Sequence, residues 1–207
     1  MVYSNELKRE IPEGWKTELI TKSCSIVDCL HSKKPDQSKD TENKFLLQLN
    51  NIKDDGLIDL SSKYFVKHHD YLEWTKRIEV EDGDVIITNA GRVAATAQVP
   101  KGLRTGIGRN ITAIRPHSIS PTYLYLSFRG EDFRRQIKWN TDTGSFFKSL
   151  NVKGIKKLYL LIPPKELEQT FESIVLPLRR KRENNQIANE KLEEIKNRLL
   201  PMLMNGQ

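Results

Sequence analysis

The clearest pattern of apolar and polar positions lies in residues 165–200. Apolar side chains recur there at alternating spacings of four and three, which is typical of the seam of a coiled-coil helix. The seam positions are Leu167, Phe171, Ile174, Leu178, Lys181, Asn185, Ala188, Leu192, Ile195 and Leu199. A helix of this length extends about 54 Å, and alone it would leave its apolar stripe in water. The pattern therefore predicts a long helix that needs a partner.

The seam is self-complementary when two copies run antiparallel about an axis at Glu183, so that residue i faces residue 366 − i. Apolar positions then face apolar ones, as Leu178 faces Ala188, and the polar Lys181 faces the polar Asn185. Polar seam residues cost stability but fix the register. We therefore expect an antiparallel homodimer. The alternative is that the stripe packs on the globular domain of its own chain.

Short apolar runs between turn residues predict strands in residues 45–49, 84–88, 93–99, 111–114 and 157–162. Ser120-Pro121 predicts the start of one helix, residues 131–139 form a second, and residues 1–10 read as loose. We expect an α+β fold: a target-binding domain with a mixed or antiparallel sheet in residues 1–164, the long dimerisation helix in residues 165–200, and a tail in residues 201–207. Pro177 lies off the seam and predicts a bend in that helix.

Charge is unevenly distributed along the chain. Residues 88–157 carry 13 basic and 3 acidic side chains, whereas residues 1–87 carry 13 basic and 17 acidic ones. A basic block within a folded domain favours a polyanionic partner, most commonly nucleic acid, although a charged surface without a partner is an alternative. The candidate DNA-binding residues share loop or turn positions and polar side chains: Asn89, Arg92, Lys101, Arg104, Arg109, Asn110, Ser145 and Lys148.

Two kinds of side chain in this set are suited to reading bases. Asn89 and Asn110 have the paired donor and acceptor that match adenine in the major groove, and Arg92 has the fork that matches guanine. An Asn beside Gly or Arg is equally typical of a turn. Base reading and turn formation therefore both remain open for these residues.

The sequence lacks the motifs of the common catalytic sites. It contains no Walker loop, no Gly-x-Gly-x-x-Gly turn and no Asn/Asp-Pro-Pro-aromatic loop of an adenine methyltransferase. Asp36, Glu42 and Lys44 resemble the signature of a metal-dependent nuclease, but with too short a gap and in a polar loop. We expect a non-catalytic, cytoplasmic protein without a signal peptide, a membrane span or a metal site, in which Cys24 and Cys29 are reduced.

Several motifs together resemble the specificity (S) subunits of Type I restriction–modification systems. Near the start stands Ile-Pro-Glu-Gly-Trp-Lys (residues 11–16), followed later by Gly-Asp-Val-Ile-Ile (residues 83–87) and Gly91-Arg92. The most specific piece joins Gly144-Ser145, residues 150–158 (Leu-Asn-Val-Lys-Gly-Ile-Lys-Lys-Leu), residues 162–164 (Ile-Pro-Pro) and Glu168-Gln169. Residues 199–206 also look like the end of an S subunit.

The resemblance implies a division of labour between subunits. A standard S subunit has two target-recognition domains and two long helices, whereas this chain has one of each and resembles a half-subunit. The domain would read one half of a split site in double-stranded DNA, and the helix would set the distance to the other half. Modification (methyltransferase) subunits with S-adenosylmethionine, and a restriction/translocase subunit with ATP and Mg²⁺, would perform the chemistry, while this chain would hold no cofactor.

Two other functions remain open at the level of the sequence. One is a dimeric DNA-binding regulator that works alone. The other is a nuclease that uses Asp36, Glu42 and Lys44. Co-purification with a methyltransferase separates the first from a specificity subunit, and metal-dependent nicking by the isolated chain would support the second.

Overall fold

A four-stranded antiparallel sheet forms the centre of the computed structural model, which describes residues 1–31, 33–40, 44–143 and 148–204. Its strands lie in the order β4 (Cys24–Asp28), β10 (Ile111–Pro116), β7 (Val85–Thr88) and β8 (Thr96–Gln98). Successive side chains of a strand point to opposite faces. Val85 and Ile87 therefore join one apolar core while Ile86 joins another, so the sheet is buried on both faces.

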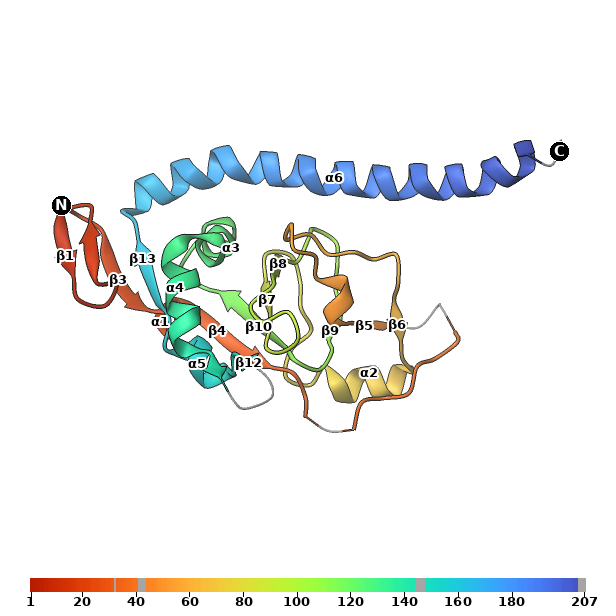
Figure 1. The fold of residues 1–207 in the computed structure, drawn as a ribbon, viewed down its shortest axis with the longest axis horizontal. Coiled ribbons are helices and arrows are strands. Elements are labelled where there is room, and N and C mark those ends of the chain that lie inside the picture. Colours follow the sequence, from red (N-terminus) through yellow and green to blue (C-terminus); the bar gives the residue numbers. More distant parts are fainter. Residues whose placement is uncertain (32, 41–43, 144–147, 205–207) are drawn as a thin grey trace.

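Helices cover one face of this sheet (Figure 1). They are α1 (Ile20–Ser23), α3 (Pro121–Arg129), α4 (Glu131–Asn140) and α5 (Val152–Lys156). The Ser120 hydroxyl accepts a hydrogen bond from the Tyr123 N–H at 3.2 Å, which satisfies one of the open donors at the start of α3. Both helices expected in this region are confirmed.

A second, smaller sheet lies beyond the other face. It consists of β6 (Tyr64–Phe65), β5 (Phe45–Leu47) and β9 (Gly106–Ile107), with β5 and β9 parallel. A 3₁₀ turn, η1 (Leu49–Asn51), follows β5, and α2 (His68–Trp74) packs below. The Trp74 indole N–H donates to the Ile107 carbonyl at 2.6 Å and ties α2 to this sheet. One parallel pair among antiparallel ones confirms the expected mixed α+β class.

The N-terminal residues were expected to be loose, and that expectation is wrong. They form a hairpin of β1 (Val2–Ser4) and β2 (Arg9–Ile11), anchored by the buried Leu7 and by hydrogen bonds from Arg9 to Asp132 on α4. Two further two-stranded sheets pair β3 (Lys16–Leu19) with β13 (Tyr159–Ile162), and β11 (Asp142–Thr143) with β12 (Lys148–Ser149).

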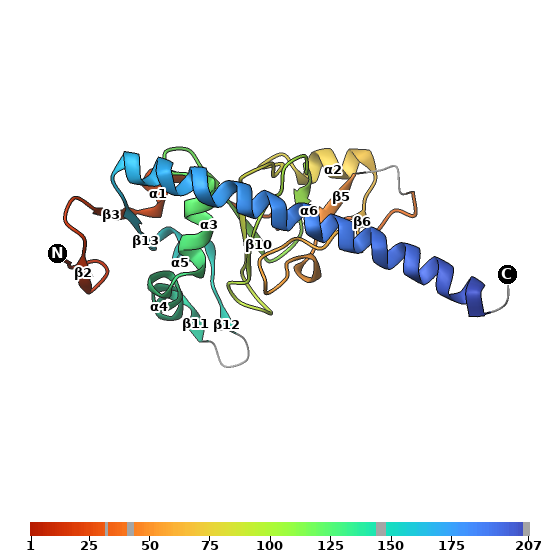
Figure 2. The same cartoon turned by 90° about the horizontal axis from the view of Figure 1, so that it is seen from above.

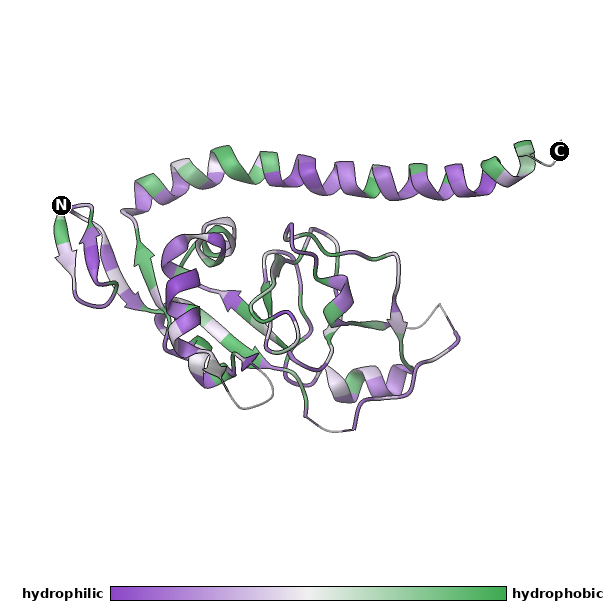
Figure 3. Ribbon diagram, viewed as in Figure 1, coloured by the Kyte–Doolittle hydropathy of each residue, from purple (hydrophilic) through white to green (hydrophobic). Residues whose placement is uncertain are grey.

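The longest element is α6 (Lys165–Met204), whose 40 residues span about 60 Å. The helix is continuous through Pro177 and Pro201 and is four residues longer than expected. It runs alongside the domain and its C-terminal part projects beyond it (Figures 1 and 2). Apolar residues recur along α6 up to its free end (Figure 3). Among the described residues, none of the helices combines the length and the apolar character needed to cross a membrane.

Candidate nucleic-acid and dimer interfaces

A polar stripe of α6 faces the domain. Glu172 accepts a hydrogen bond from the Thr122 hydroxyl at 2.8 Å, and Glu168, only 3% exposed, accepts one from the Ser120 N–H. Further along, Arg179 pairs with Asp82 at 3.5 Å. These residues are spaced by four and seven positions, about one and two helical turns, which places them on one side of the helix. The helix therefore docks on its domain through polar and charged groups.

The apolar seam of α6 lies on another side of the helix and remains exposed. Its large apolar residues are 47–63% exposed: Leu167, Ile174, Leu178, Leu192, Ile195 and Leu199. Phe171 is the exception, since its ring packs edge-to-face on Tyr123 with centroids 5.6 Å apart. The alternative that the whole stripe packs on its own domain is therefore wrong, and the stripe has no partner within the described chain.

Four of the candidate DNA-binding residues gather at one edge of the central sheet, where β7 ends and β10 begins. The Asn89 N–H donates to the Asn110 carbonyl at 2.8 Å, and the Leu150 N–H donates to the Asn89 carbonyl at the same distance. Arg109 precedes Asn110, and Lys148 on β12 is two residues from Leu150. We call Asn89, Arg109, Asn110 and Lys148 the polar edge. Ser145 lies outside the described residues.

The two asparagines of the polar edge differ in how their side chains are held. The Asn89 amide donates to the Leu150 carbonyl at 2.8 Å and accepts from the Thr112 hydroxyl at 3.1 Å, so it holds β7, β10 and β12 together. Asn110 is exposed and has a φ of 60°, a left-handed turn conformation that Asn tolerates better than most residues. The turn interpretation therefore holds for both backbones, while only the Asn110 side chain points to an open surface.

The other three candidates lie elsewhere. Arg92, in the β7–β8 turn, pairs with Asp54 at 2.7 Å and donates to the carbonyls of Leu49 and Ile52, so its fork already has partners. Arg104 pairs with Glu81, which precedes β7. Lys101 is exposed in the loop after β8, at the same end of the sheet as Glu81. The sequence-based set is thus divided between two ends of the sheet, and its contact with DNA remains a prediction.

Lys34 is a basic residue near Arg109 that the sequence did not place there. Its ammonium lies 3.5 Å from the centre of the Tyr64 ring. Burial, and then the charge of the nearby Arg109, lower the pKa of Lys34. This proximity could not be predicted from the sequence because the two positions are 75 residues apart.

Much of the positive charge of residues 88–157 is neutralised inside the domain. Arg115, for example, forms two hydrogen bonds with the buried Asp84, at 2.8 and 2.6 Å. Within the described ranges, no ion pair involves the lysines of the segment around β12 and α5: Lys148, Lys153, Lys156 and Lys157. Lys148 belongs to the polar edge, and Lys153, Lys156 and Lys157 lie on or directly after α5.

One cluster has the residue types of a metal site. Donor atoms of Asp28, Cys29 and His31 lie within 4.8 Å of one another, and His31 is hydrogen-bonded to Asp28 at 2.7 Å. A metal binds cysteine as thiolate, yet burial raises the pKa of Cys29, as it raises that of Cys24 to about 12. A structural zinc site needs four donors, and the described residues bring together three. The cluster does not meet those requirements.

The described residues do not bring the three candidate nuclease residues together in a site. Glu42 lies outside the described residues, and the Lys44 ammonium sits 5.8 Å from the centre of the Tyr71 ring.

Comparisons with known proteins agree with the motifs. The sequence is 32% identical over 85 residues, 41% of this chain, to the HindI specificity subunit of the Type I restriction enzyme from Haemophilus influenzae, of which it covers 18%. It is 23% identical over its full length to the MjaIX specificity subunit from Methanocaldococcus jannaschii, of which it covers 47%. The chain thus spans less than half of these relatives. No protein-family model matches it.

The fold agrees with solved structures of such subunits. The HsdS subunit from Thermoanaerobacter tengcongensis matches 89% of this chain with a TM-score of 0.53 and 16% identity, over 40% of its own length. The Type I S subunit from M. genitalium matches 91% with a TM-score of 0.52 and 15% identity, over 45% of its own length. The resemblance that the motifs indicated is confirmed: in sequence and in fold, this chain is similar to specificity subunits of Type I restriction–modification systems, over less than half of their length.

Proposed function

We propose that this chain is a sequence-specific DNA-binding subunit of a Type I restriction–modification complex and reads one half of a bipartite site. The curated relatives are named as specificity subunits of Type I restriction enzymes, and the polar edge offers an exposed Lys148 and an exposed Asn110. Phosphate contacts position such a protein, and contacts to base edges specify the sequence. Lys148 and Arg109 fit the first role, and Asn110 fits the second.

The observation that carries the proposal furthest is the exposed seam of α6. The helix docks on its own domain through a polar stripe and keeps an apolar stripe exposed along more than four heptads. A second copy in antiparallel register covers that stripe with apolar residues, and a two-fold axis makes the contact identical from both sides. Two inverted copies of one reader recognise a palindromic target whose half-sites are separated by unread bases.

The chemistry of the complex belongs to other subunits in this proposal. Modification subunits bring S-adenosylmethionine and methylate the site, while a restriction/translocase subunit brings ATP and Mg²⁺. This chain supplies recognition and the symmetric platform on which the other subunits assemble. Purified alone, it neither methylates nor cuts DNA.

Mapping of adenine methylation in cells with and without the gene for this chain tests the function. Loss of a split palindromic motif, together with co-purification of a methyltransferase, is the expected result. An unchanged methylome and DNA binding without a methyltransferase would instead indicate the stand-alone regulator. A non-palindromic motif would mean that a different second half completes the site.

The register of the dimer has a separate test. Leu178→Cys and Ala188→Cys are placed on differently tagged chains, and the products are oxidised and separated. Antiparallel pairing gives the mixed 178–188 disulfide. A parallel pair gives 178–178 and 188–188 products instead, and would remove both the register and the palindrome.

A further inference from the structure

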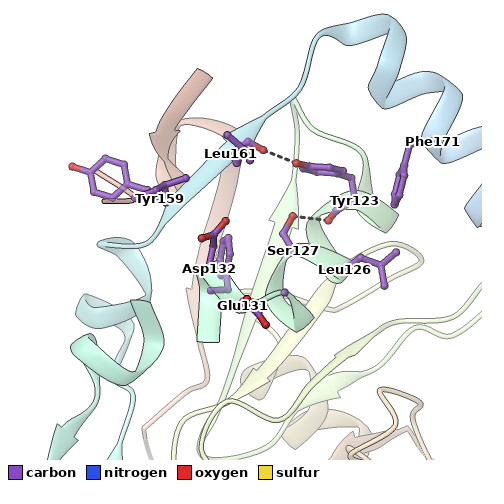
Figure 4. A pocket seen from close by; sticks show the side chains of 11 residues that line it. Tyr123, Leu126, Ser127, Glu131, Asp132, Tyr159, Leu161 and Phe171 are labelled. Carbon is purple, nitrogen blue, oxygen red and sulfur yellow. Dashed lines mark hydrogen bonds between the residues drawn. The ribbon is translucent and has the colours of Figure 1, made fainter. Parts of the chain in front are cut away.

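An apolar pocket lies at the base of α6. It is enclosed by the N-terminal hairpin, α3, α4, β13 and the first turns of α6, and its volume is about 240 Å³. Its apolar walls are formed by Leu7, Tyr123, Leu126, Phe133, Leu161 and Phe171. Figure 4 shows Phe171 reaching down from α6 beside Tyr123. Small-molecule sites usually exceed about 300 Å³, so this pocket suits one or two apolar side chains.

Phe171 connects this pocket with the dimer seam. It is a seam position of α6, and it also forms part of the pocket wall. The polar residues Glu168 and Glu172, which dock α6 on the domain, lie on another side of the helix. Phe171 therefore belongs both to the wall of the pocket and to the seam that a second helix would cover.

The C-terminal end of α6 is an apolar segment without a partner in its own chain. All side chains from Lys191 to Met204 are exposed, with Leu203 at 74% and Met204 at 77%. This part of the helix projects past the domain (Figure 1). The alternating spacing of the seam continues three residues beyond Leu199, to Met202. The seam is thus one position longer than residues 165–200 indicated.

In the antiparallel register, the end of one helix reaches the pocket of the other chain. Phe171 faces Ile195 of the second copy, and the following seam positions of that copy, Leu199 and Met202, face Leu167 and Pro164. We propose that the pocket receives the last turn of α6 from a second copy, with Met202 as the inserted side chain. Met suits such an irregular cavity because it is unbranched and flexible. This inference rests on the antiparallel dimer proposed above.

The contact can form only between chains. Residues 171 and 202 of one α6 are separated by 31 residues of continuous helix, a distance of about 46 Å. A helix end cannot return to the pocket of its own chain across that length. The two-fold axis would produce two such contacts, one at each end of the helix pair.

A photo-crosslinking amino acid in the purified full-length chain tests the contact. At position 202 it should yield covalent dimers, and mass spectrometry should place the crosslink in partner peptides that contain Leu126, Tyr159 or Leu161. Position 204 provides the matched control, because two residues turn a helix by about 200°. At that position few covalent dimers are expected, and none to the pocket peptides.

Affinity provides the second measurement. Met202→Glu should weaken dimerisation at least tenfold in sedimentation equilibrium, whereas Met204→Glu should change it less than threefold. Leu126→Glu in the pocket should weaken it similarly, and the double variant should be no weaker than the single ones, because both remove the same contact. Circular dichroism verifies that each variant is folded.

The outcomes separate this contact from the dimer itself. If the 178–188 disulfide forms but position 202 gives no crosslink to the pocket and Met202→Glu dimerises normally, the pocket contact is wrong and the dimer stands. If the chain is monomeric and no 178–188 disulfide forms, both the proposed dimer and the proposed pocket contact are wrong. Crosslinks from position 202 that appear only after a methyltransferase is added would assign the tail to that partner and overturn the proposal.

Discussion

Asn89 and Asn110 carry the same side chain but have different roles at the polar edge. The amide of Asn89 bridges three strands through Leu150 and Thr112, whereas Asn110 is exposed and supports a turn with positive φ. A side chain that already holds the fold together is costly to remove, since its buried partners lose their hydrogen bonds. An exposed side chain on a tolerant backbone can be removed with little effect on stability.

The first prediction compares Asn110→Gly with Asn89→Ala. Glycine accepts positive φ without strain, so Asn110→Gly should keep the melting temperature while specific binding weakens by about 1–3 kcal/mol, the usual cost of one base contact. Asn89→Ala should lower the free energy of unfolding by about 1–3 kcal/mol. Equal losses by Asn110→Gly on cognate and random DNA would assign Asn110 to backbone contacts.

Glu183 gives a prediction about pH. Burial raises the pKa of this carboxyl by more than the positive charge of the nearby Arg179 lowers it. The folded state then holds its proton more tightly than the unfolded state, so Glu183 favours folding most below its unfolded pKa and loses that contribution as pH rises through its folded pKa. Urea denaturation should therefore show Glu183→Gln gaining stability relative to the wild type between pH 4 and pH 7. A constant difference would contradict the raised pKa.

At the scale of elements, α6 follows its helical pattern despite two prolines. Pro177 cannot donate to the Ser173 carbonyl, yet the helix continues through it with the seam in phase. Pro within a helix costs about 3 kcal/mol relative to Ala, although a bend that follows the domain recovers part of that cost. The helix is thus one continuous element, and the bend expected at Pro177 stays a prediction.

The prediction for this element is that Pro177→Ala raises the free energy of unfolding by about 1–3 kcal/mol. Pro201→Ala, three residues from the end of the described helix, is the matched control and should have a smaller effect, because helix ends fray. Chemical denaturation measures both variants. A loss of stability in Pro177→Ala would mean that the bend itself is required for α6 to dock on Asp82 and Ser120.

The elements with long or strongly apolar patterns could be predicted from the sequence, and the short polar ones could not. The seam predicted α6, and the apolar run in residues 84–88 predicted the central strand β7. The β1–β2 hairpin was missed because three-residue strands pair locally and carry no period. The charge of Arg92 was predicted but not its partner Asp54, 38 residues away, because only the tertiary fold brings the two side chains together.

At the scale of the whole molecule, α6 lies along its domain as far as Glu193, which lines a cleft together with Lys53 and Asp59, and its C-terminal part projects beyond the domain. The residues after Glu193 extend about 17 Å, so the two domains of the proposed dimer lie beside the helix pair and not beyond its ends. Lys148 lies at the end of the central sheet where β7 ends, and Lys101 lies at the other end, after β8. Substitutions at the two ends should therefore change the salt dependence of DNA binding differently.

The last prediction uses that difference to locate the DNA surface. Each phosphate contact releases counterions, so log K falls with log salt concentration by about 0.9 per contact. Lys148→Gln should reduce the magnitude of this slope by about 1 per DNA-bound domain, whereas Lys101→Gln should leave it unchanged. Titration of duplex DNA at several salt concentrations, followed by fluorescence anisotropy, measures both variants. A reduced slope for Lys101→Gln alone would move the DNA surface to the Glu81 end of the sheet, and a slope near zero for the wild type would exclude a phosphate-binding surface altogether.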